Sequence, residues 1–157
     1  MCGLLLALVT GCDNPFAPAL RGAATSPFTD AGTVGGLLQN FVTAYELRDS
    51  LRYAELLDEQ FQFQYYDPQL QRTDGWFRET DLRTTARLFR TFDNLSLIWV
   101  GLSAEEAAIA TPDVLVEVRV QYQLVLDELS PVIGSARFTM YKPAGDRFHI
   151  VLWQDEM

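Results

Sequence analysis

The chain has 157 residues, enough for one domain built around a single core. Hydrophobic residues make up 48% and charged residues 21% of the chain, a balance that indicates a folded globular protein rather than disorder. The net charge of −9 argues against nucleic-acid binding, which requires basic stripes that neutralise phosphates. One His and two Cys leave little material for a metal site, and no motif indicates a cofactor.

The first twelve residues contain a short apolar run, Leu4 to Val9, and end with Val9-Thr10-Gly11-Cys12. This ending resembles the lipobox of bacterial lipoprotein signal peptides. The resemblance implies cleavage after residues 1–11, acylation of Cys12, and a lipid anchor in a membrane of the bacterial cell envelope, with the protein facing the periplasm or the exterior. No Lys or Arg precedes the apolar run, which favours a true start upstream of Met1. The alternative is an apolar terminus that merely ends in Cys.

Residues 12–33 are interpreted as the acylated Cys followed by a flexible linker. Fourteen of the 21 residues from Asp13 to Thr33 are Ala, Gly, Pro, Ser or Thr, and they follow neither a helical nor a strand period. Cleavage before Cys12 would also remove Cys2. No disulfide and no catalytic thiol would then remain in the mature chain.

The folded domain is expected over residues 34–157, with helices first. Apolar residues at three- and four-residue steps predict a helix over about 37–47. Asp49 or Ser50 can cap a second helix that extends to residue 57. The period then changes to two, and residues 61–66 alternate as a short half-buried strand.

A loop is predicted over residues 67–75, because Asp67-Pro68 and Gly75 are turn residues. A third helix is expected over 79–92, with Leu82, Ala86 and Phe89 on its buried face. Three arginines of this helix, at positions i, i+4 and i+7, form either a solvent-exposed face or a binding site for an anion. The negative net charge of the chain favours the solvent-exposed face. These are Arg83, Arg87 and Arg90.

The remainder is predicted to be sheet. Strands are expected over residues 95–102, 114–126, 132–141 and 147–153, with a loop or helical turn over 105–110. The second of these strands has seven alternating apolar positions, which indicates a long antiparallel strand with one face on a core. Strong strands joined by tight turns form a meander, and the fold class is therefore α+β.

Two stretches carry a resemblance to a known family. They are Phe41-x-x-Ala44-Tyr45-x-x-Arg48-Asp49-x-x-x-Tyr53-x-x-Leu56-Leu57-x-x-x-Phe61 and the closing run from Arg147 to Asp155. With the element order, they resemble the nuclear transport factor two-like (SnoaL/ketosteroid-isomerase-like) domain over residues 34–157. The resemblance implies a cone-shaped, curved antiparallel sheet wrapped around three N-terminal helices. It says little about activity, because this scaffold hosts isomerases, dehydratases, ligand binders and structural modules.

The cone fold implies a cavity between sheet and helices, and aromatic residues are the candidates to line it. They are Tyr45, Tyr65, Trp99, Tyr122, Phe138 and Trp153. Such a lining favours a flat apolar ligand held by a few hydroxyl or indole donors. The alternative is that the six side chains simply fill the cone as core.

His149 is the weak candidate for a catalytic base. Strand alternation places it with Arg147, Val151 and Trp153, opposite Phe148, Ile150 and Leu152. It lies either on the outer face of the sheet, through which members of the family commonly pair as homodimers, or in the cavity.

No pair of carboxylates shares a face in a way that predicts carboxylate chemistry. Asp67 and Asp74 fall in turns, and Glu117 falls on the polar face of the long strand. Two functions therefore stand. The first is a membrane-tethered, non-enzymatic domain that binds a small apolar ligand or a partner protein. The second is an isomerase or dehydratase acting on a small cyclic substrate, which requires His149 or an Asp inside the cavity within reach of a Tyr hydroxyl.

Overall fold

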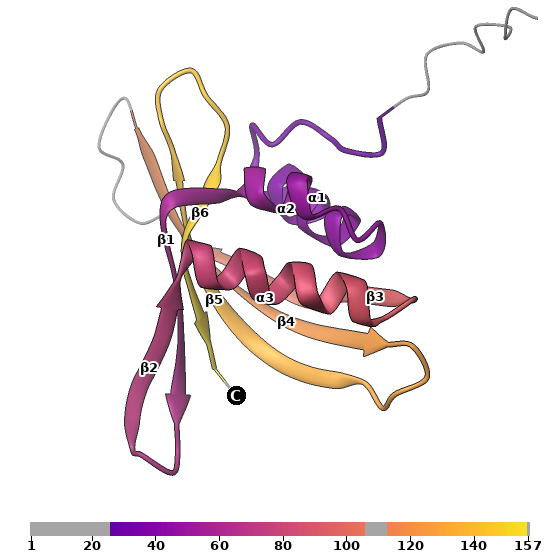
Figure 1. The fold of residues 1–157 in the computed structure, drawn as a ribbon. Coiled ribbons are helices and arrows are strands. Elements are labelled where there is room, and N and C mark those ends of the chain that lie inside the picture. The colour runs from indigo at the N-terminus through magenta and orange to yellow at the C-terminus, as the bar shows by residue number, and fades with distance from the viewer. Residues whose placement is uncertain (1–25, 106–112, 157) are drawn as a thin grey trace, which may run out of the picture.

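The computed structural model describes residues 26–105 and 113–156. The elements are α1 (Val34–Glu46), α2 (Ser50–Leu56), β1 (Leu57–Asp67), β2 (Arg72–Phe77), α3 (Arg78–Thr91), β3 (Leu95–Glu105), β4 (Val114–Leu126), β5 (Val132–Lys142) and β6 (His149–Asp155). The strands form one six-stranded sheet in the order β2-β1-β6-β5-β4-β3 (Figure 1). All pairings are antiparallel except that of β1 with β6, which is parallel. The fold class is α+β, as predicted.

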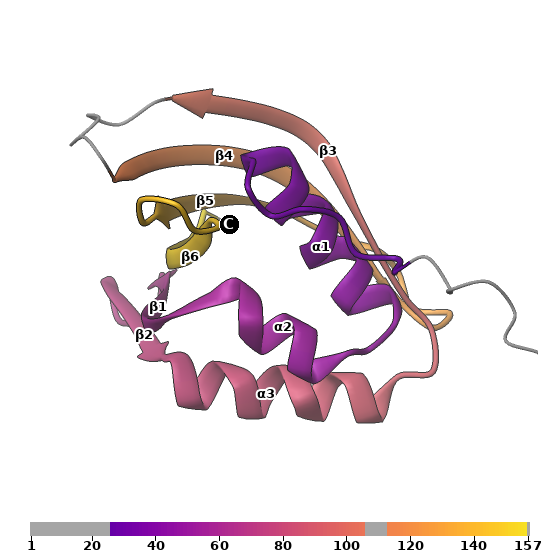
Figure 2. The ribbon, with the colours of Figure 1, turned by 90° about the horizontal axis from the view of Figure 1, so that it is seen from above.

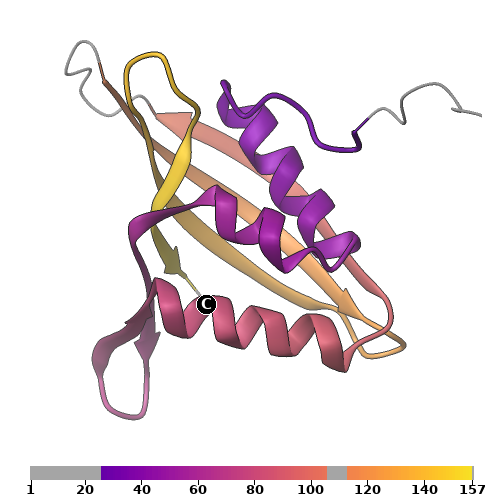
Figure 3. The ribbon, with the colours of Figure 1, turned by 45° about the horizontal axis from the view of Figure 1, so that its top comes forward.

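The curved sheet and the helices form two layers. Viewed from above, strands β3 and β4 curve around α1, and all three helices lie on the same side of the sheet (Figure 2). Figure 3 shows α1, α2 and α3 in front of the long strands. The cone-shaped arrangement expected from the sequence is therefore present, with the helices on the concave side.

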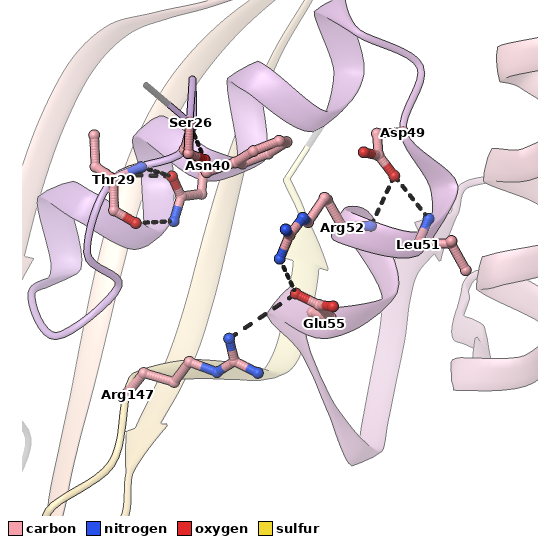
Figure 4. A network of polar contacts seen from close by, with 9 residues as sticks. Ser26, Thr29, Asn40, Asp49, Leu51, Arg52, Glu55 and Arg147 are labelled. Atoms are coloured by element: carbon pink, nitrogen blue, oxygen red, sulfur yellow. Dashed lines mark hydrogen bonds and ion pairs between the residues drawn. The ribbon is translucent and has the colours of Figure 1, made fainter. Parts of the chain in front are cut away.

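The first two helices begin at the caps that their sequences provide. The side chain of Thr33 accepts a hydrogen bond from the Gly36 N–H at the start of α1. The carboxylate of Asp49 accepts from the N–H groups of Leu51 and Arg52 at the start of α2, which selects Asp49 over Ser50 as the cap (Figure 4). Both helices match the predicted ranges within a few residues.

The predicted loop over residues 67–75 is wrong, because part of it is a strand. β2 pairs with β1 as a hairpin, in a register that places Gly75 opposite Gln64 and Trp76 opposite Phe63. A Cβ at Gly75 would lie only 2.1 Å from the carbonyl oxygen of Phe63. Glycine is therefore required at position 75, where the backbones of β1 and β2 approach closely. Gly75, which suggested a turn in the sequence, instead lies inside the hairpin.

A β-bulge in β6 changes which residues face the core. Met140 of β5 pairs with Ile150 and Thr139 pairs with Leu152, so Val151 is an extra residue between them. Ile150 and Trp153 consequently lie on the same inner face, whereas simple alternation places them on opposite faces. The predicted grouping of His149 with Trp153 is therefore wrong.

Phe41 is at the centre of the core and is fully buried. Its ring lies within 6.0 Å, between centroids, of five other aromatic rings, which belong to α1, α2, β3, β5 and β6. These rings belong to Tyr45, Tyr53, Trp99, Phe138 and Trp153. Offset and edge contacts of this kind stabilise a core beyond the burial of area alone. Four of the six aromatic residues singled out in the sequence therefore meet around Phe41, namely Tyr45, Trp99, Phe138 and Trp153.

The end of the expected linker packs against the domain. Thr29 and Asn40 exchange two hydrogen bonds of 2.7 and 2.9 Å between backbone and side-chain amide (Figure 4). Ala31 is buried, and its carbonyl accepts from the N–H of Phe148. Residues 26–33 are therefore part of the folded unit. The lipobox, Cys12 and the rest of the linker lie outside the described residues, as does the predicted loop or turn from residue 106 onward.

Candidate functional site

A cavity of about 90 Å³ lies between α1 and the long strands. Five of its lining residues are aromatic: Phe41 and Tyr45 from α1, Trp99 from β3, Tyr122 from β4 and Trp153 from β6. Leu97, Leu124 and Val132 complete the wall. A 150 Å³ apolar cavity accommodates benzene, so this one holds a group of roughly four or five heavy atoms.

Four of the six residues predicted to line a pocket border this cavity, namely Tyr45, Trp99, Tyr122 and Trp153. Phe138 is fully buried beneath it and contacts the rings of Trp99 and Trp153. Tyr65 lies elsewhere, against Phe63 and Trp76 and beside a separate hollow of about 120 Å³. The inner surface of the cone is therefore partly core and partly open space.

The two tryptophans of the cavity differ in their hydrogen bonding. The indole N–H of Trp99 donates to the carbonyl of Leu38 on α1 at 3.1 Å. The buried indole nitrogen of Trp153 has no acceptor among the residues that the structure describes. A buried donor without a partner costs about 1–3 kcal/mol.

Tyr122, which lines the cavity, meets the carboxylate of Asp155, which borders the neighbouring hollow of Tyr65. This pair is called the rim pair below. The hydroxyl of Tyr122 donates to the carboxylate of Asp155 at 3.2 Å; Tyr122 is buried and Asp155 is partly buried. Burial raises the pKa of Tyr122 to about 12, and the nearby Asp155 charge raises it too. Burial also raises the pKa of Asp155, while the bond from Tyr122 lowers it.

Gly134 makes this orientation of Tyr122 possible. Gly134 is the register partner of Tyr122 on β5, and a Cβ there would lie 2.5 Å from the tyrosine oxygen and 2.6 Å from Cζ. The tyrosine ring therefore lies across the bare backbone of Gly134. Any larger residue at this position requires the ring to move.

A second tyrosine–carboxylate pair lies on the helix side of the cone. Asp81, in the first turn of α3, accepts hydrogen bonds from the Tyr53 hydroxyl at 2.7 Å and from the Trp76 indole N–H at 3.0 Å. Tyr53 is 1% exposed and Asp81 is 4% exposed. Burial raises the pKa of Asp81, and its two donors oppose the shift. Burial also raises the pKa values of Tyr53 and Tyr45 well above their usual range.

The remaining sequence candidates are far from this chemistry. His149 pairs in register with Tyr141, next to the buried pair Met140–Ile150, and so lies on the outer face of the sheet. Glu117, also on that face, forms an ion pair with Arg137 at 3.6 Å. The structure therefore selects the outer-face alternative for His149 and removes it from the cavity.

The acidic and basic residues in turns and on α3 have local roles. Asp67 accepts from two backbone N–H groups of its own turn, and Asp74 bonds to the Gly75 N–H and to Arg72. The arginine stripe of α3 is exposed, which matches the solvated alternative.

Sequence reasoning missed both carboxylates that meet tyrosines. Asp81 lies one residue before the apolar stripe of Leu82 and Ala86, and the face that is buried is that of Asp81, Thr85 and Phe89. Asp155 closes the C-terminal run that carried the family resemblance, but no role was assigned to it. Trp76 lies five residues before Asp81, and no pattern in the sequence indicated that its indole N–H would donate to that carboxylate.

The described residues hold no group of three or more His, Cys, Asp or Glu side chains that could bind a metal ion. Nor, within residues 26–105 and 113–156, is any helix long and apolar enough to cross a membrane. The chemistry that the cone offers is therefore an aromatic cavity, one unpaired indole donor and a tyrosine–carboxylate pair at the rim.

Comparison with solved structures identifies the fold. The chain superimposes on a proposed scytalone dehydratase from Novosphingobium aromaticivorans with a TM-score of 0.58 and 12% identity, covering 79% of this chain and 82% of that one. It superimposes on a nuclear transport factor two-like protein of unknown function from Pseudomonas putida with a TM-score of 0.61 and 10% identity, covering 78% and 82%.

A third similar structure is the helical cell shape determining protein of Campylobacter jejuni, with a TM-score of 0.59 and 14% identity. That match covers 77% of this chain and 40% of the larger protein. No family model matches the sequence, and no curated protein sequence does. The chain has the nuclear transport factor two-like fold.

Proposed function

We propose that the domain is a binding module that takes a small, mostly apolar ligand into the aromatic cavity and carries out no covalent chemistry on it. The aromatic lining of the cavity is the observation that carries this proposal, because five of its eight wall residues are aromatic and the other three are aliphatic. A small apolar space of this kind matches a ligand with a compact hydrocarbon body.

The test is a titration with tert-butanol, whose five heavy atoms fit a space of roughly this size. Amide chemical shifts in ¹H–¹⁵N spectra are expected to change at cavity positions such as Leu97, Tyr122 and Trp153. Leu97→Phe fills the cavity and is expected to abolish these changes. Leu115→Phe, an equal enlargement at a side chain that is 38% exposed, is the matched control and should leave them intact. Changes that persist in Leu97→Phe would contradict the proposal.

The second candidate function is an isomerase or dehydratase of a small cyclic substrate, and the Tyr122–Asp155 pair favours it. An ionised Asp155 would serve as base, and the Tyr122 hydroxyl would donate to a developing oxyanion. A scytalone dehydratase is proposed for one protein of the same fold. The test is deuterium exchange into 3-cyclohexenone in D₂O, followed by NMR. Exchange that disappears in Asp155→Asn would replace the binding proposal with the enzymatic one.

We also propose that Cys12 anchors the domain to a membrane of the bacterial cell envelope. The run Val9-Thr10-Gly11-Cys12 and the small-residue tract after it support this. Cells fed a clickable fatty acid are expected to label the protein, and Cys12→Ala should abolish the label. Cys2→Ala is the matched control and should retain it. A label that survives Cys12→Ala would exclude the anchor.

A further inference from the structure

The cavity is lined by aromatic rings and contains no charged side chain. Five of its eight lining residues are aromatic and three are aliphatic. The faces of aromatic rings carry negative electrostatic potential, and sites built from several of them attract organic cations. Neutral apolar groups gain only burial in such a space, whereas a cation gains burial and the attraction of the rings.

The charges around the cavity have the sign that a cation requires. The Asp155 carboxylate is bonded to the hydroxyl of Tyr122, whose ring is part of the wall. Glu117 and Glu156 pair with Arg137 on the outer face of the sheet. Asp155 is therefore the carboxylate of this strand that contacts the cavity wall, in a chain whose net charge is −9.

The helix side contributes a further negative group. Asp81 lies behind the cavity wall, because it is bonded to Tyr53, whose ring packs edge-on against those of Phe41 and Tyr45. The Tyr53 hydroxyl donates to Asp81, as that of Tyr122 donates to Asp155. Hydrogen bonds from a phenol to a carboxylate increase the electron density of the ring, because neighbouring hydrogen bonds polarise one another. The aromatic cavity is therefore flanked by one carboxylate on each side.

The size of the space limits the cation. About 90 Å³ admits a compact group of roughly four or five heavy atoms, such as a nitrogen with its methyl substituents. A primary ammonium is strongly hydrated and would lose that hydration among rings that cannot replace it. A methylated ammonium has an apolar surface and a diffuse charge, and matches the wall on both counts.

We propose that the cavity binds the alkylammonium group of a small organic cation, with Asp155 as its counter-ion at the rim. This inference rests on the proposed binding function and specifies the class of ligand. The part of the ligand beyond the ammonium group extends toward Tyr122 and Asp155.

The experiment compares two molecules of nearly equal size and shape, tetramethylammonium chloride and tert-butanol, at constant ionic strength set with NaCl. Dissociation constants are measured by ¹H–¹⁵N chemical shifts and by the fluorescence of the cavity tryptophans. The cation is expected to bind about tenfold more tightly, a difference of the size reported for desolvated cation–aromatic contacts. Asp155→Asn keeps the shape of the rim and removes its charge, and should reduce this preference to about threefold or less.

The outcomes separate the two proposals. Equal affinities, or tighter binding of tert-butanol, would overturn the cation inference and leave the binding function intact. Absence of binding by either molecule would overturn both. A cation preference that is unchanged in Asp155→Asn would overturn the counter-ion role. Glu128→Gln, which removes one charge in the β4–β5 turn, is the control for the loss of net charge and should leave the preference unchanged.

Discussion

The two tyrosine–carboxylate pairs of this domain have the same chemical groups in different surroundings. Asp81 accepts two hydrogen bonds from Tyr53 and Trp76 and is almost completely buried between α2, β2 and α3. Asp155 accepts one longer bond from Tyr122 and remains partly exposed at the end of β6. The first pair joins three elements, while the second lies at the rim of a cavity.

This difference indicates that burial and the number of hydrogen bonds decide whether the carboxylate of such a pair is structural or available to a ligand. A carboxylate whose acceptor positions are taken by two buried donors is a structural connection, and a ligand reaches it only if the fold opens. A carboxylate with one partner and access to water can exchange that partner for a ligand. The buried pair should therefore control stability, and the rim pair should control binding.

The largest effect is expected from Asp81→Ala. This substitution leaves the Tyr53 hydroxyl and the Trp76 indole N–H without an acceptor inside the protein, at a cost of about 1–3 kcal/mol each. We expect a loss of about 2–4 kcal/mol in the free energy of unfolding, measured by urea denaturation. Asp155→Ala is the matched substitution and should cost under about 1 kcal/mol, because water can replace it. Equal losses would show that the two pairs are not distinct.

Gly134→Ala is expected to have the next largest effect. The new methyl group would overlap the ring of Tyr122 and force it away from Asp155. Strain from overpacking typically costs about 1–3 kcal/mol. In a Tyr122→Ala background the same change should cost little, because the ring that it displaces is absent. Additive losses in this double-mutant cycle would refute the close contact.

The pH dependence of stability provides a third comparison. Burial raises the pKa of Asp81, so the folded state keeps the proton at pH values where the unfolded carboxyl has lost it. Its contribution to the free energy of unfolding is therefore complete at low pH and declines as the pH rises through the folded pKa. Relative to Asp81→Asn, the native protein should lose stability as the pH rises above about 4, the ordinary pKa of an aspartic acid. An increase over that range would reverse the assigned direction.

The smallest effects are expected from removal of single hydroxyls. Tyr53→Phe leaves Asp81 with one donor and should cost about 1–2 kcal/mol, since the bond involves a buried carboxylate. Tyr122→Phe removes a longer bond from a half-exposed carboxylate and should cost under about 1 kcal/mol. Thermal unfolding of the two variants gives the ranking, and the reverse order would contradict the assignment of roles.

Much of the architecture could be predicted from the sequence, because local periodicity and helix caps determine where most helices and strands lie. Thr33 and Asp49 begin α1 and α2, and the alternation from Val114 to Leu126 marks β4. The hairpin of β1 and β2 could not be read. The short sequence of β2 contains turn residues, and only its pairing with β1 makes it a strand.

The site was predictable only in part. The sequence offered six aromatic residues as candidates to line a cavity or to fill the core, and four of them, Tyr45, Trp99, Tyr122 and Trp153, border one cavity. It placed Trp153 on the face of His149, because the bulge at Val151 arises from pairing with β1 and β5 and not from the local pattern of β6. It also gave Asp81 no role, since a helix stripe can be shifted by one residue without changing its period.

The sequence by itself therefore determined the fold class, the order of the elements other than β2 and the aromatic character of the interior, since these depend on residue type and local spacing. The tertiary structure alone decided the register of β6, the burial of Asp81 and the meeting of Tyr122 with Asp155. Each of these depends on contacts between segments that are far apart in the chain: Tyr122 and Asp155 are separated by 33 residues, and Tyr53 and Asp81 by 28. Local patterns carry no information about such distances, and the choice between a structural and a binding carboxylate rests on them.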